Sequence, residues 1–294
     1  MSAPRLVIVY RETQLAGLLA EHSTLGNVEF FLSTRGQTVA PLVAADEAQR
    51  RALDETAAAV PGDWRLATVE REHLSRFLFE PDDLVAVVGQ DGLVPNVSKY
   101  LGQQCVLGIS PAAPGLLCRH APADLARVLA GEVTPRLEER TTVEAVTDDG
   151  QRLRALNEIF VGDRGHQSAR YEIQVGERME EQSSSGIIVG TGTGATGWLA
   201  SLWLQAQPAF VLPGSDSTEL AYFVREAWPS ATTGTSLTSG IVMAGAGVSL
   251  TARSSLVVFG DGIERDRLHL EWGQGLTVAA SPTPLRLLRV DGQR

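Results

Sequence analysis

Three short segments of this chain carry residues that could bind or transform a phosphorylated ligand. The first is Gly89–Gly92 (GQDG), which follows the apolar run Leu84–Val88. At the carboxyl end of a buried strand, glycine lets backbone amides approach a phosphate, and an aspartate can accept a proton from a hydroxyl group or hold Mg²⁺. An Asp-Gly pair is also a common turn, so the segment alone allows both a functional and a structural interpretation.

The second segment is Gly190–Gly197 (GTGTGATG), which lies between a short apolar run and a helix expected to start at Trp198. Its threonine hydroxyls and glycine amides, at the beginning of a helix, would form a favourable anion site. The pattern also matches a dinucleotide-binding fingerprint, because Asp216 follows the last glycine by 19 residues. Its late position in the chain and the loop pattern around Asp216 weigh against that fold, and a purely structural turn is the remaining alternative.

The third segment is Leu156–Ile159 (LNEI), in which an Asn-Glu pair opens an apolar, β-branched run. Asn157 and Glu158 could together hydrogen-bond the two hydroxyls of a vicinal diol. A polar pair at a strand end is the simpler interpretation of this segment alone. Arg164 and His166 could add cationic donors, although a solvated hairpin tip accounts for them as well.

Composition excludes several large classes of enzyme. The chain has 294 residues and a net charge of −10, which argues against non-specific binding to nucleic acid or to anionic membranes. Lys99 is the only lysine, and it lies outside any GxxxxGK[ST] motif, which excludes a P-loop NTPase. A protein kinase is excluded too, because the strand lysine and the H-R-D loop are missing.

Cysteine and histidine usage gives no sign of a structural metal site. The 2 cysteines, Cys105 and Cys118, form no C-x-x-C pair, and the 5 histidines are dispersed, so we expect reduced thiols and leave any metal ligand unassigned. No signal-peptide pattern is present, and no apolar run reaches the roughly 18–20 residues of a membrane helix. We therefore expect a cytoplasmic protein without a membrane or nucleic-acid partner.

The pattern of apolar runs predicts an α/β domain followed by a β-rich domain. In the first part we expect strands at Leu6–Tyr10, Val28–Leu32, Leu84–Val88 and Cys105–Ile109, with helices over Ala44–Ala59 and Val97–Gln103. Continuous apolar strands that alternate with helices indicate a parallel sheet covered on both faces. Beyond it, short alternating segments punctuated by glycine indicate antiparallel strands, with one helix from Trp198 to about Gln205. The expected domains are residues 1–122 and 123–274, and a C-terminal segment, 275–294, could return to the first domain.

Taken in order, the segments of this chain resemble those of the NAD kinase family. The likeness covers about residues 84–290, and its Thr-Gly-Thr-Gly version is closer to the mitochondrial-type enzymes. The segments that carry it, with the family motif each resembles, are Gly89–Gly92 (G-G-D-G), Leu107–Ser110 with Gly115–Leu117 (G-I-N…G-[FV]-L), Leu156–Ile159 (L-N-E-[IV]), Ser185–Trp198 (D-G-x-x-x-x-T-P-T-G-S-T-A-Y) and Phe259–Gly262 (the late Asp-Gly turn).

This resemblance implies both an architecture and an activity. The architecture is an α/β domain with a Rossmann-like parallel sheet and a β-rich, sandwich-like domain, the fold of NAD kinases and diacylglycerol kinase-like enzymes. The active site would lie between them, in a homodimer or homotetramer. The activity is transfer of the γ-phosphoryl group of ATP, with Mg²⁺, to the adenosine 2′-hydroxyl of NAD or NADH. Such chemistry requires mainly positioning and charge neutralisation.

The resemblance also assigns roles to individual residues. Asp91 would orient or deprotonate the acceptor hydroxyl. The residues implied to bind phosphate and ATP are Gly89, Gln90, Gly92, Thr191, Gly192, Thr193 and Gly194. The residues implied to bind NAD are Asn157, Glu158, Ser185, Thr196, Trp198 and Ser201.

The departures from the family pattern include four positions in or beside its motifs. Gln90 replaces a glycine, Leu93 a threonine, Ser110 an asparagine and Ser185 an aspartate. These departures keep a catalytically silent nucleotide sensor of the same fold as an alternative. A related kinase acting on a lipid, sugar or nucleoside hydroxyl is another, and a dehydrogenase that uses Gly192–Gly197 with Asp216 is the least favoured. Because Asp91, Asn157 and Glu158 are retained, we favour a working kinase.

Overall fold

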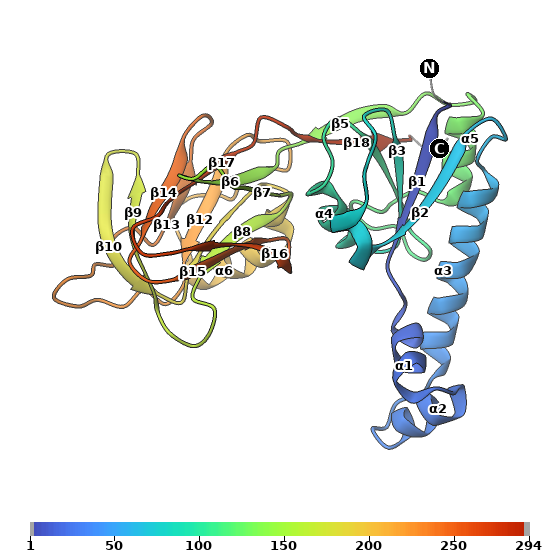
Figure 1. Ribbon diagram of the computed structural model, residues 1–294, viewed down its shortest axis with the longest axis horizontal. Coiled ribbons are helices and arrows are strands. Elements are labelled where there is room, and N and C mark those ends of the chain that lie inside the picture. Colours follow the sequence, from blue (N-terminus) through green and yellow to red (C-terminus); the bar gives the residue numbers. More distant parts are fainter. Residues whose placement is uncertain (1–2, 291–294) are drawn as a thin grey trace. The chain divides into compact units, whose positions relative to one another are not determined.

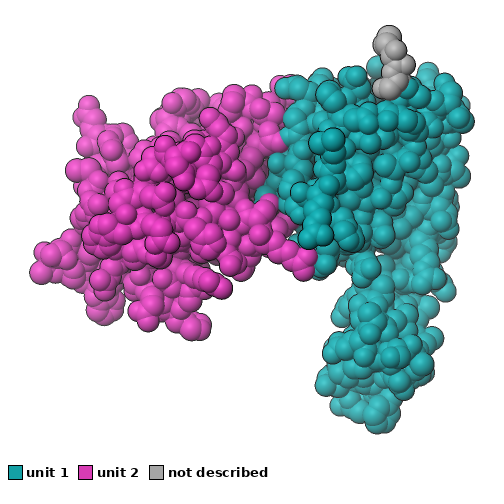
Figure 2. Space-filling model, in the orientation of Figure 1, with its two compact units in different colours: residues 1–138, 286–294 teal, residues 139–285 magenta. Residues whose placement is uncertain are grey.

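The computed structural model describes residues 3–290 and divides into two compact units. The first unit comprises Met1–Glu138 with Arg286–Arg294, and the second comprises Glu139–Leu285 (Figure 2). Each unit has its own sheet system and its own hydrophobic core. The expected combination of an α/β part and a β-rich part is thereby confirmed.

The first unit is built on one mixed sheet whose central strands are parallel. Strand β1 pairs in parallel with β2 and β3, β3 with β4, and β4 with β18. In spatial order the strands are β2 (Arg65–Glu70), β1 (Arg5–Tyr10), β3 (Leu84–Val88), β4 (Cys105–Ile109), β18 (Leu285–Arg289) and β5 (Arg136–Arg140) (Figure 1). The apolar runs of β3 and β4 are buried on both faces, as expected for interior parallel strands.

Helices cover this sheet and extend beyond it. They are α1 (Gln14–His22), α2 (Leu25–Ser33), α3 (Ala40–Ala58), η1 (Arg71–Arg76), α4 (Leu93–Ser98) and α5 (Pro122–Leu129). Residues of α3 and α5 pack on one face, where Leu6, Ile8 and Leu107 of the sheet meet Ala52 and Leu125. Helices α1 and α2 lie past the end of the sheet, beside the first turns of α3 (Figure 1). They enclose a small core of their own with α3.

Two expected elements of the first unit are placed differently by the structure. Val28–Leu32, expected as a strand, lies inside α2, so that prediction is wrong. The hydroxyl of Thr24 accepts a hydrogen bond from the Asn27 amide and caps the helix, and Val28 and Leu32, one turn apart, are buried on the same side. Of the helix expected over Val97–Gln103, only Val97 and Ser98 are helical, because α4 spans Leu93–Ser98 and begins directly after Gly92.

The described residues of the second unit form two antiparallel sheets that share one core. One sheet has the order β10 (Arg178–Ser184), β9 (Ala169–Val175), β14 (Gly247–Ala252), β17 (Gly275–Ala280), β6 (Val143–Thr147) and β7 (Arg152–Ala155). The other has the order β13 (Ser239–Val242), β12 (Leu220–Val224), β11 (Ile187–Gly190), β8 (Glu158–Gly162), β15 (Leu256–Gly260) and β16 (Ile263–Leu270).

Successive side chains of β8 point to opposite faces of its sheet. Ile159 and Val161 point into the core shared by the two sheets, whereas Phe160 points to the opposite face. On that face Phe160 packs with Leu199 of α6 (Trp198–Ala206), the helix that follows the short turn η2 (Gly194–Thr196). The face of β8 that carries Glu158 and Phe160 is therefore the face covered by α6.

The unit boundaries differ from the expected domain boundaries at both ends. Residues 123–138 belong to the first unit, because α5 packs on α3 there. Residues 275–285 belong to the second unit, because β17 pairs with both β14 and β6. Only the final strand, β18, joins the first unit, where it pairs with β4.

Two further general features concern the described residues. Cys105 and Cys118 are both free thiols. Within residues 3–290, none of the helices combines the length and the apolar character needed to cross a membrane.

The placement of the final strand can be tested through Leu287, which is 1% exposed and pairs with Val106 of β4. Replacing Leu287 by alanine should lower the free energy of unfolding by about 2–5 kcal/mol, because it leaves a cavity in a packed sheet. The matched control is Met243→Ala, at a side chain that is 62% exposed. Urea unfolding measures both variants, and an unchanged midpoint for Leu287→Ala would contradict the pairing of β18 with β4.

Candidate functional site

The Gly89–Gly92 loop leaves the carboxyl end of β3 and turns directly into α4. The Gly89 amide donates to the carbonyl of Ile109, 2.9 Å away, which ties the loop to β4. The carbonyl of Gln90 accepts from the Leu93 amide at 2.9 Å, and this bond starts the turn into the helix. Gly89 is buried, whereas Gln90 and Gly92 are exposed, so the loop presents its second and fourth residues to solvent.

The Asp91 carboxylate is the anchor of a second loop. Its Oδ2 accepts a hydrogen bond from the amide of Leu116 at 2.7 Å. Its Oδ1 accepts from the amides of Leu117 at 2.9 Å and Cys118 at 2.7 Å. Gly115 lies against the same carboxylate, and a Cβ there would be 2.2 Å from Oδ1. In this structure Asp91 therefore holds the turn of Gly115–Cys118.

Two further contacts fix the loop that Asp91 anchors. A Cβ added to Gly108 of β4 would lie 2.2 Å from the carbonyl oxygen of Leu117, so the loop packs backbone against backbone on the strand. The guanidinium of Arg289, from β18, donates to the carbonyl of Leu116 at 3.2 Å. Burial, with a further contribution from the Asp91 charge, raises the pKa of the Cys118 thiol to about 12, so the thiol stays protonated.

In the second unit, Asp261 holds the segment that precedes β8. It lies in the turn between β15 and β16 with φ of 54°, and it is only 9% exposed. Its Oδ2 accepts from the amide of Leu156 at 2.8 Å, and its Oδ1 accepts from the amides of Asn157 at 2.8 Å and Glu158 at 3.4 Å. The Asp-Gly turn is among the motifs of the sequence, but Asp261 is not among the predicted site residues.

Thr191 joins the glycine-rich loop to the same segment. Its amide donates to the carbonyl of Asn157 at 2.9 Å, and its hydroxyl donates to the carbonyl of Leu156 at 2.6 Å. The hydroxyl also accepts from the amides of Thr193 at 3.1 Å and Gly194 at 3.3 Å. The structure thus brings Asn157, Glu158, Thr191–Gly194 and Asp261 into one hydrogen-bonded cluster, which we call the acceptor cluster.

Close backbone contacts explain why this loop is rich in glycine. A Cβ on Gly192 would lie 1.8 Å from the carbonyl oxygen of Gly214, and one on Gly194 would lie 2.4 Å from the carbonyl oxygen of Asn157. Side chains at either position would therefore push the loop away from its neighbours. The glycine pattern is accounted for by packing within the second unit.

Most amides of the glycine-rich loop are already engaged. Besides the bonds made by Thr191, the amides of Ala195 and Thr196 donate to the carbonyls of Thr191 and Thr193. A phosphate at this loop would have to share or displace such bonds. The hydroxyl of Thr193 is a different case, because it is buried and has no hydrogen-bond partner among the described residues.

Glu158 has the most perturbed carboxyl group of the cluster. Burial, reinforced by the nearby charge of Asp261, raises its pKa from 4.5 to about 8. The group is therefore mostly neutral at pH 7 and can donate one hydrogen bond as well as accept others. A carboxyl perturbed in this way, next to a polar cluster, is a feature of functional sites.

An aromatic surface adjoins the cluster on the α6 face of β8. The ring of Trp198 stacks on Phe160 with centroids 5.9 Å apart and an interplanar angle of 15°. Phe259 of β15 packs against Phe160 at 4.9 Å, and the guanidinium of Arg225 lies 5.7 Å from the Trp198 ring centroid. Because Trp198 is 36% exposed, this surface can accept a planar ring.

The remaining predicted residues lie around this surface or apart from the cluster. Thr196 and Ser201 are exposed at and beyond the start of α6, and the Thr196 hydroxyl donates to the carbonyl of Thr193 at 3.0 Å. Ser185 is exposed before β11, whereas Thr191 follows the other end of that strand. Ser185 instead pairs through its amide with the carbonyl of Arg225 at 2.9 Å.

The side chains present do not match the implied Mg²⁺. No group of three or more His, Cys, Asp or Glu residues among residues 3–290 could hold a metal ion. The carboxylate of Asp91 is engaged by backbone amides. These residues therefore do not form a site that would bind the metal on the protein alone.

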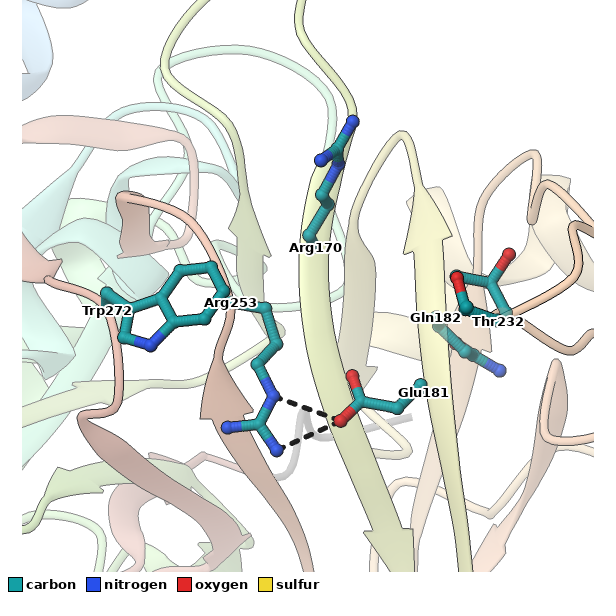
Figure 3. Close-up of a pocket in the computed structure, with 7 residues that line it drawn as sticks. Arg170, Glu181, Gln182, Thr232, Arg253 and Trp272 are labelled. Atoms are coloured by element: carbon teal, nitrogen blue, oxygen red, sulfur yellow. Dashed lines mark hydrogen bonds and ion pairs between the residues drawn. The ribbon is translucent and has the colours of Figure 1, made fainter.

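The second unit also has a pocket that was not predicted from the sequence. It has a volume of about 300 Å³ and is lined by Arg170, Glu181, Gln182, Thr232, Thr233, Arg253 and Trp272 (Figure 3). Arg253 is directed toward Glu181, with a shortest distance of 2.9 Å, and also pairs with Glu172 at 3.1 Å. The residues that line the pocket come from several distant segments, and none belongs to the acceptor cluster.

Comparisons with known proteins add no family assignment. No protein-family model matches this chain, and no curated protein matches it either. The functional interpretation therefore depends on the motifs and on the geometry described above.

Replacing a glycine by alanine should affect stability differently in the two glycine-containing loops. Gly192→Ala should destabilise the protein by about 1–3 kcal/mol, because its Cβ would collide with the Gly214 backbone. Gly92→Ala should change stability by less than about 0.5 kcal/mol, because the site has helical φ and nothing lies within 4 Å of its Cβ. Thermal unfolding measures both variants, and equal stability of Gly192→Ala and the wild type would contradict the loop packing.

The raised pKa of Glu158 predicts a pH-dependent contribution to stability. Between its ordinary pKa of 4.5 and about 8, the folded state keeps a proton that the unfolded state releases. The stability contributed by this group is therefore complete below pH 4.5 and falls as the pH rises to about 8. Glu158→Gln should remove that slope, whereas Glu264→Gln, at an exposed glutamate, should keep it. Urea unfolding at several pH values measures the slope, and identical slopes in all three proteins would exclude a raised pKa.

Proposed function

We propose that this protein is an ATP-dependent kinase that phosphorylates the adenosine 2′-hydroxyl of NAD or NADH. The observation that carries this proposal is the acceptor cluster. Three segments singled out by the resemblance, distant in sequence, are joined through Thr191 and Asp261 around Asn157 and Glu158. That these motif residues share one hydrogen-bond network supports a common role for them, which no single motif does.

In this proposal the acceptor cluster recognises the ribose and the aromatic surface takes a planar ring. Asn157 can donate and accept, and the neutral carboxyl of Glu158 can do the same, which suits a pair of adjacent hydroxyls. Trp198 offers the stacking surface, and Arg225 beside it supplies positive charge for a pyrophosphate. Thr196 and Ser201, on the exposed side of α6, contribute further hydroxyl groups.

Asp91 would act on the reacting hydroxyl while it keeps its hold on the loop. A carboxylate offers about four lone-pair sites, and three are used by the amides of Leu116–Cys118. The remaining site can accept the hydrogen bond of the 2′-hydroxyl and then its proton. The hydroxyl oxygen forms a bond to the γ-phosphorus, the bond from that phosphorus to the bridging oxygen breaks, and ADP leaves.

The donor phosphates are assigned to the exposed parts of the loops. Gln90 can donate its side-chain amide to a phosphate oxygen, and Gly92 lets a phosphate approach the backbone, because nothing lies within 4 Å of its Cβ position. Mg²⁺ enters this proposal only with ATP, since triphosphate oxygens supply most ligands of such an ion. Its chemistry is neutralisation of phosphate charge.

A nucleotide-binding sensor without transfer is the second candidate function. The specific observation that favours it is the engagement of Asp91 by three loop amides, together with Gln90 in place of a motif glycine. A sensor of this kind would bind ATP and NAD at the same residues but would form no NADP.

The deciding assay is NADP(H) formation by the full chain with ATP and Mg²⁺, offered NAD or NADH. Asp91→Asn should lower turnover by about a hundredfold or more, the scale of a positioned acid–base group. Asp63→Asn, at an exposed aspartate of the same unit, serves as the matched control and should keep wild-type turnover.

Thermal unfolding of Asp91→Asn must accompany the assay, because the variant also loses a loop anchor. A wild-type protein that binds ATP and NAD without turnover would replace the kinase proposal with the sensor. Turnover of a lipid, sugar or nucleoside hydroxyl instead of NAD would keep the chemistry and change the acceptor.

A further inference from the structure

The segment before β8 is held from both sides by two residues, Asp261 and Thr191. The amides of Leu156 and Asn157 donate to Asp261, while the carbonyls of the same two residues accept from Thr191. Each residue thus has both of its backbone polar groups bound by this pair. Asn157 and Glu158 project from a backbone that has little freedom to rotate.

We call this pair of residues, Asp261 and Thr191, the clamp. The conformation and burial of Asp261 carry an energetic cost. Its φ of 54° lies in the left-handed region, where glycine is easily accommodated and aspartate is less favourable. Its carboxylate is also almost completely removed from water. A glycine would make the same turn without either cost, so the carboxylate serves a purpose beyond turn formation.

We propose that Asp261 is the positioning residue of the acceptor cluster, acting with Thr191 to fix Asn157 and Glu158 in the geometry that meets a ligand. This inference rests on the proposed function for the identity of the ligand, but not for the clamp itself. Asp261 touches no reacting atom, and its influence reaches the ligand through the backbone of Leu156–Glu158.

The clamp has an electrostatic consequence that supports the proposal. Because Asp261 lies beside the start of β8, its charge adds to burial in raising the pKa of Glu158. A neutral Glu158 can donate a hydrogen bond to a ligand oxygen, which an ionised carboxylate cannot do. Asp261 therefore fixes the place of Glu158 and adds to burial in favouring its neutral form.

Two substitutions separate this role from turn formation. Asp261→Asn removes the charge, keeps one acceptor oxygen and tolerates the left-handed backbone, whereas Asp261→Gly removes the whole side chain and favours that backbone. The matched control is Asp148→Asn, because Asp148 also accepts a backbone amide, that of Gly275, elsewhere in the same unit. Each variant is made in the full chain.

The first readout is the titration of the Glu158 carboxyl by carbon NMR, with glutamate labelled at the carboxyl carbon and the signal assigned by its loss in Glu158→Gln. The midpoint should fall by about one pH unit in Asp261→Asn and Asp261→Gly, a tenfold change in proton affinity. It should stay unchanged in Asp148→Asn. An unchanged midpoint in both Asp261 variants would overturn the proposal.

The second readout is NAD affinity by equilibrium dialysis, which should fall at least tenfold in Asp261→Gly, a loss of at least about 1.4 kcal/mol. The affinity of Asp148→Asn should stay within about threefold of wild type. Wild-type affinity in Asp261→Gly would also overturn the proposal. Failure of the kinase proposal is recognised separately, because a wild type that forms no NADP(H) still shows the Glu158 titration and its response to Asp261.

Discussion

A carboxylate that leaves water must have its lost hydrogen bonds replaced, and each unit of this chain does so with backbone amides. Asp91 accepts from the amides of Leu116, Leu117 and Cys118, and Asp261 accepts from those of Leu156, Asn157 and Glu158. Both aspartates precede a glycine, and both hold a segment that carries recognisable motif residues. The rest of each site depends on this interaction, because it gathers three backbone amides of a separate segment at one carboxylate.

The glycines described below allow close backbone packing, whereas the motifs suggest phosphate binding. In the first unit Gly108 and Gly115 let the anchored loop approach β4 and Asp91, and in the second Gly192 and Gly194 let three segments of backbone meet. In each case a Cβ would collide with the chain itself. The glycines therefore serve the same arrangement as the aspartates, since amides can converge on a carboxylate only where the backbone can come close.

The sequence predicts those elements of the structure that are determined by contacts between neighbouring residues. It does not predict those that depend on contacts between distant residues. The strands β3 and β4 were predicted at their observed bounds, because continuous apolar runs between turn signals are typical of interior parallel strands. Val28–Leu32 has the same short apolar appearance but belongs to a helix, because the capping bond of Thr24 and packing against Leu15 decide it. The anchoring role of Asp261 joins residues 103–105 positions apart, a pairing that no local pattern encodes.

In the kinase proposal the carboxylate of Asp91 must both hold the loop of Gly115–Cys118 and act on the acceptor hydroxyl. The amides that donate to it use three of its lone-pair sites, which leaves about one for the acceptor hydroxyl. They also fix its orientation, which matters more for phosphoryl transfer, where the attacking oxygen needs positioning more than proton removal. In the kinase proposal Asp91 therefore contributes mainly by aligning the hydroxyl, and the loop of Gly115–Cys118 becomes part of the catalytic apparatus through it. Substitutions in that loop would then affect turnover without touching the substrate, because they would move Asp91.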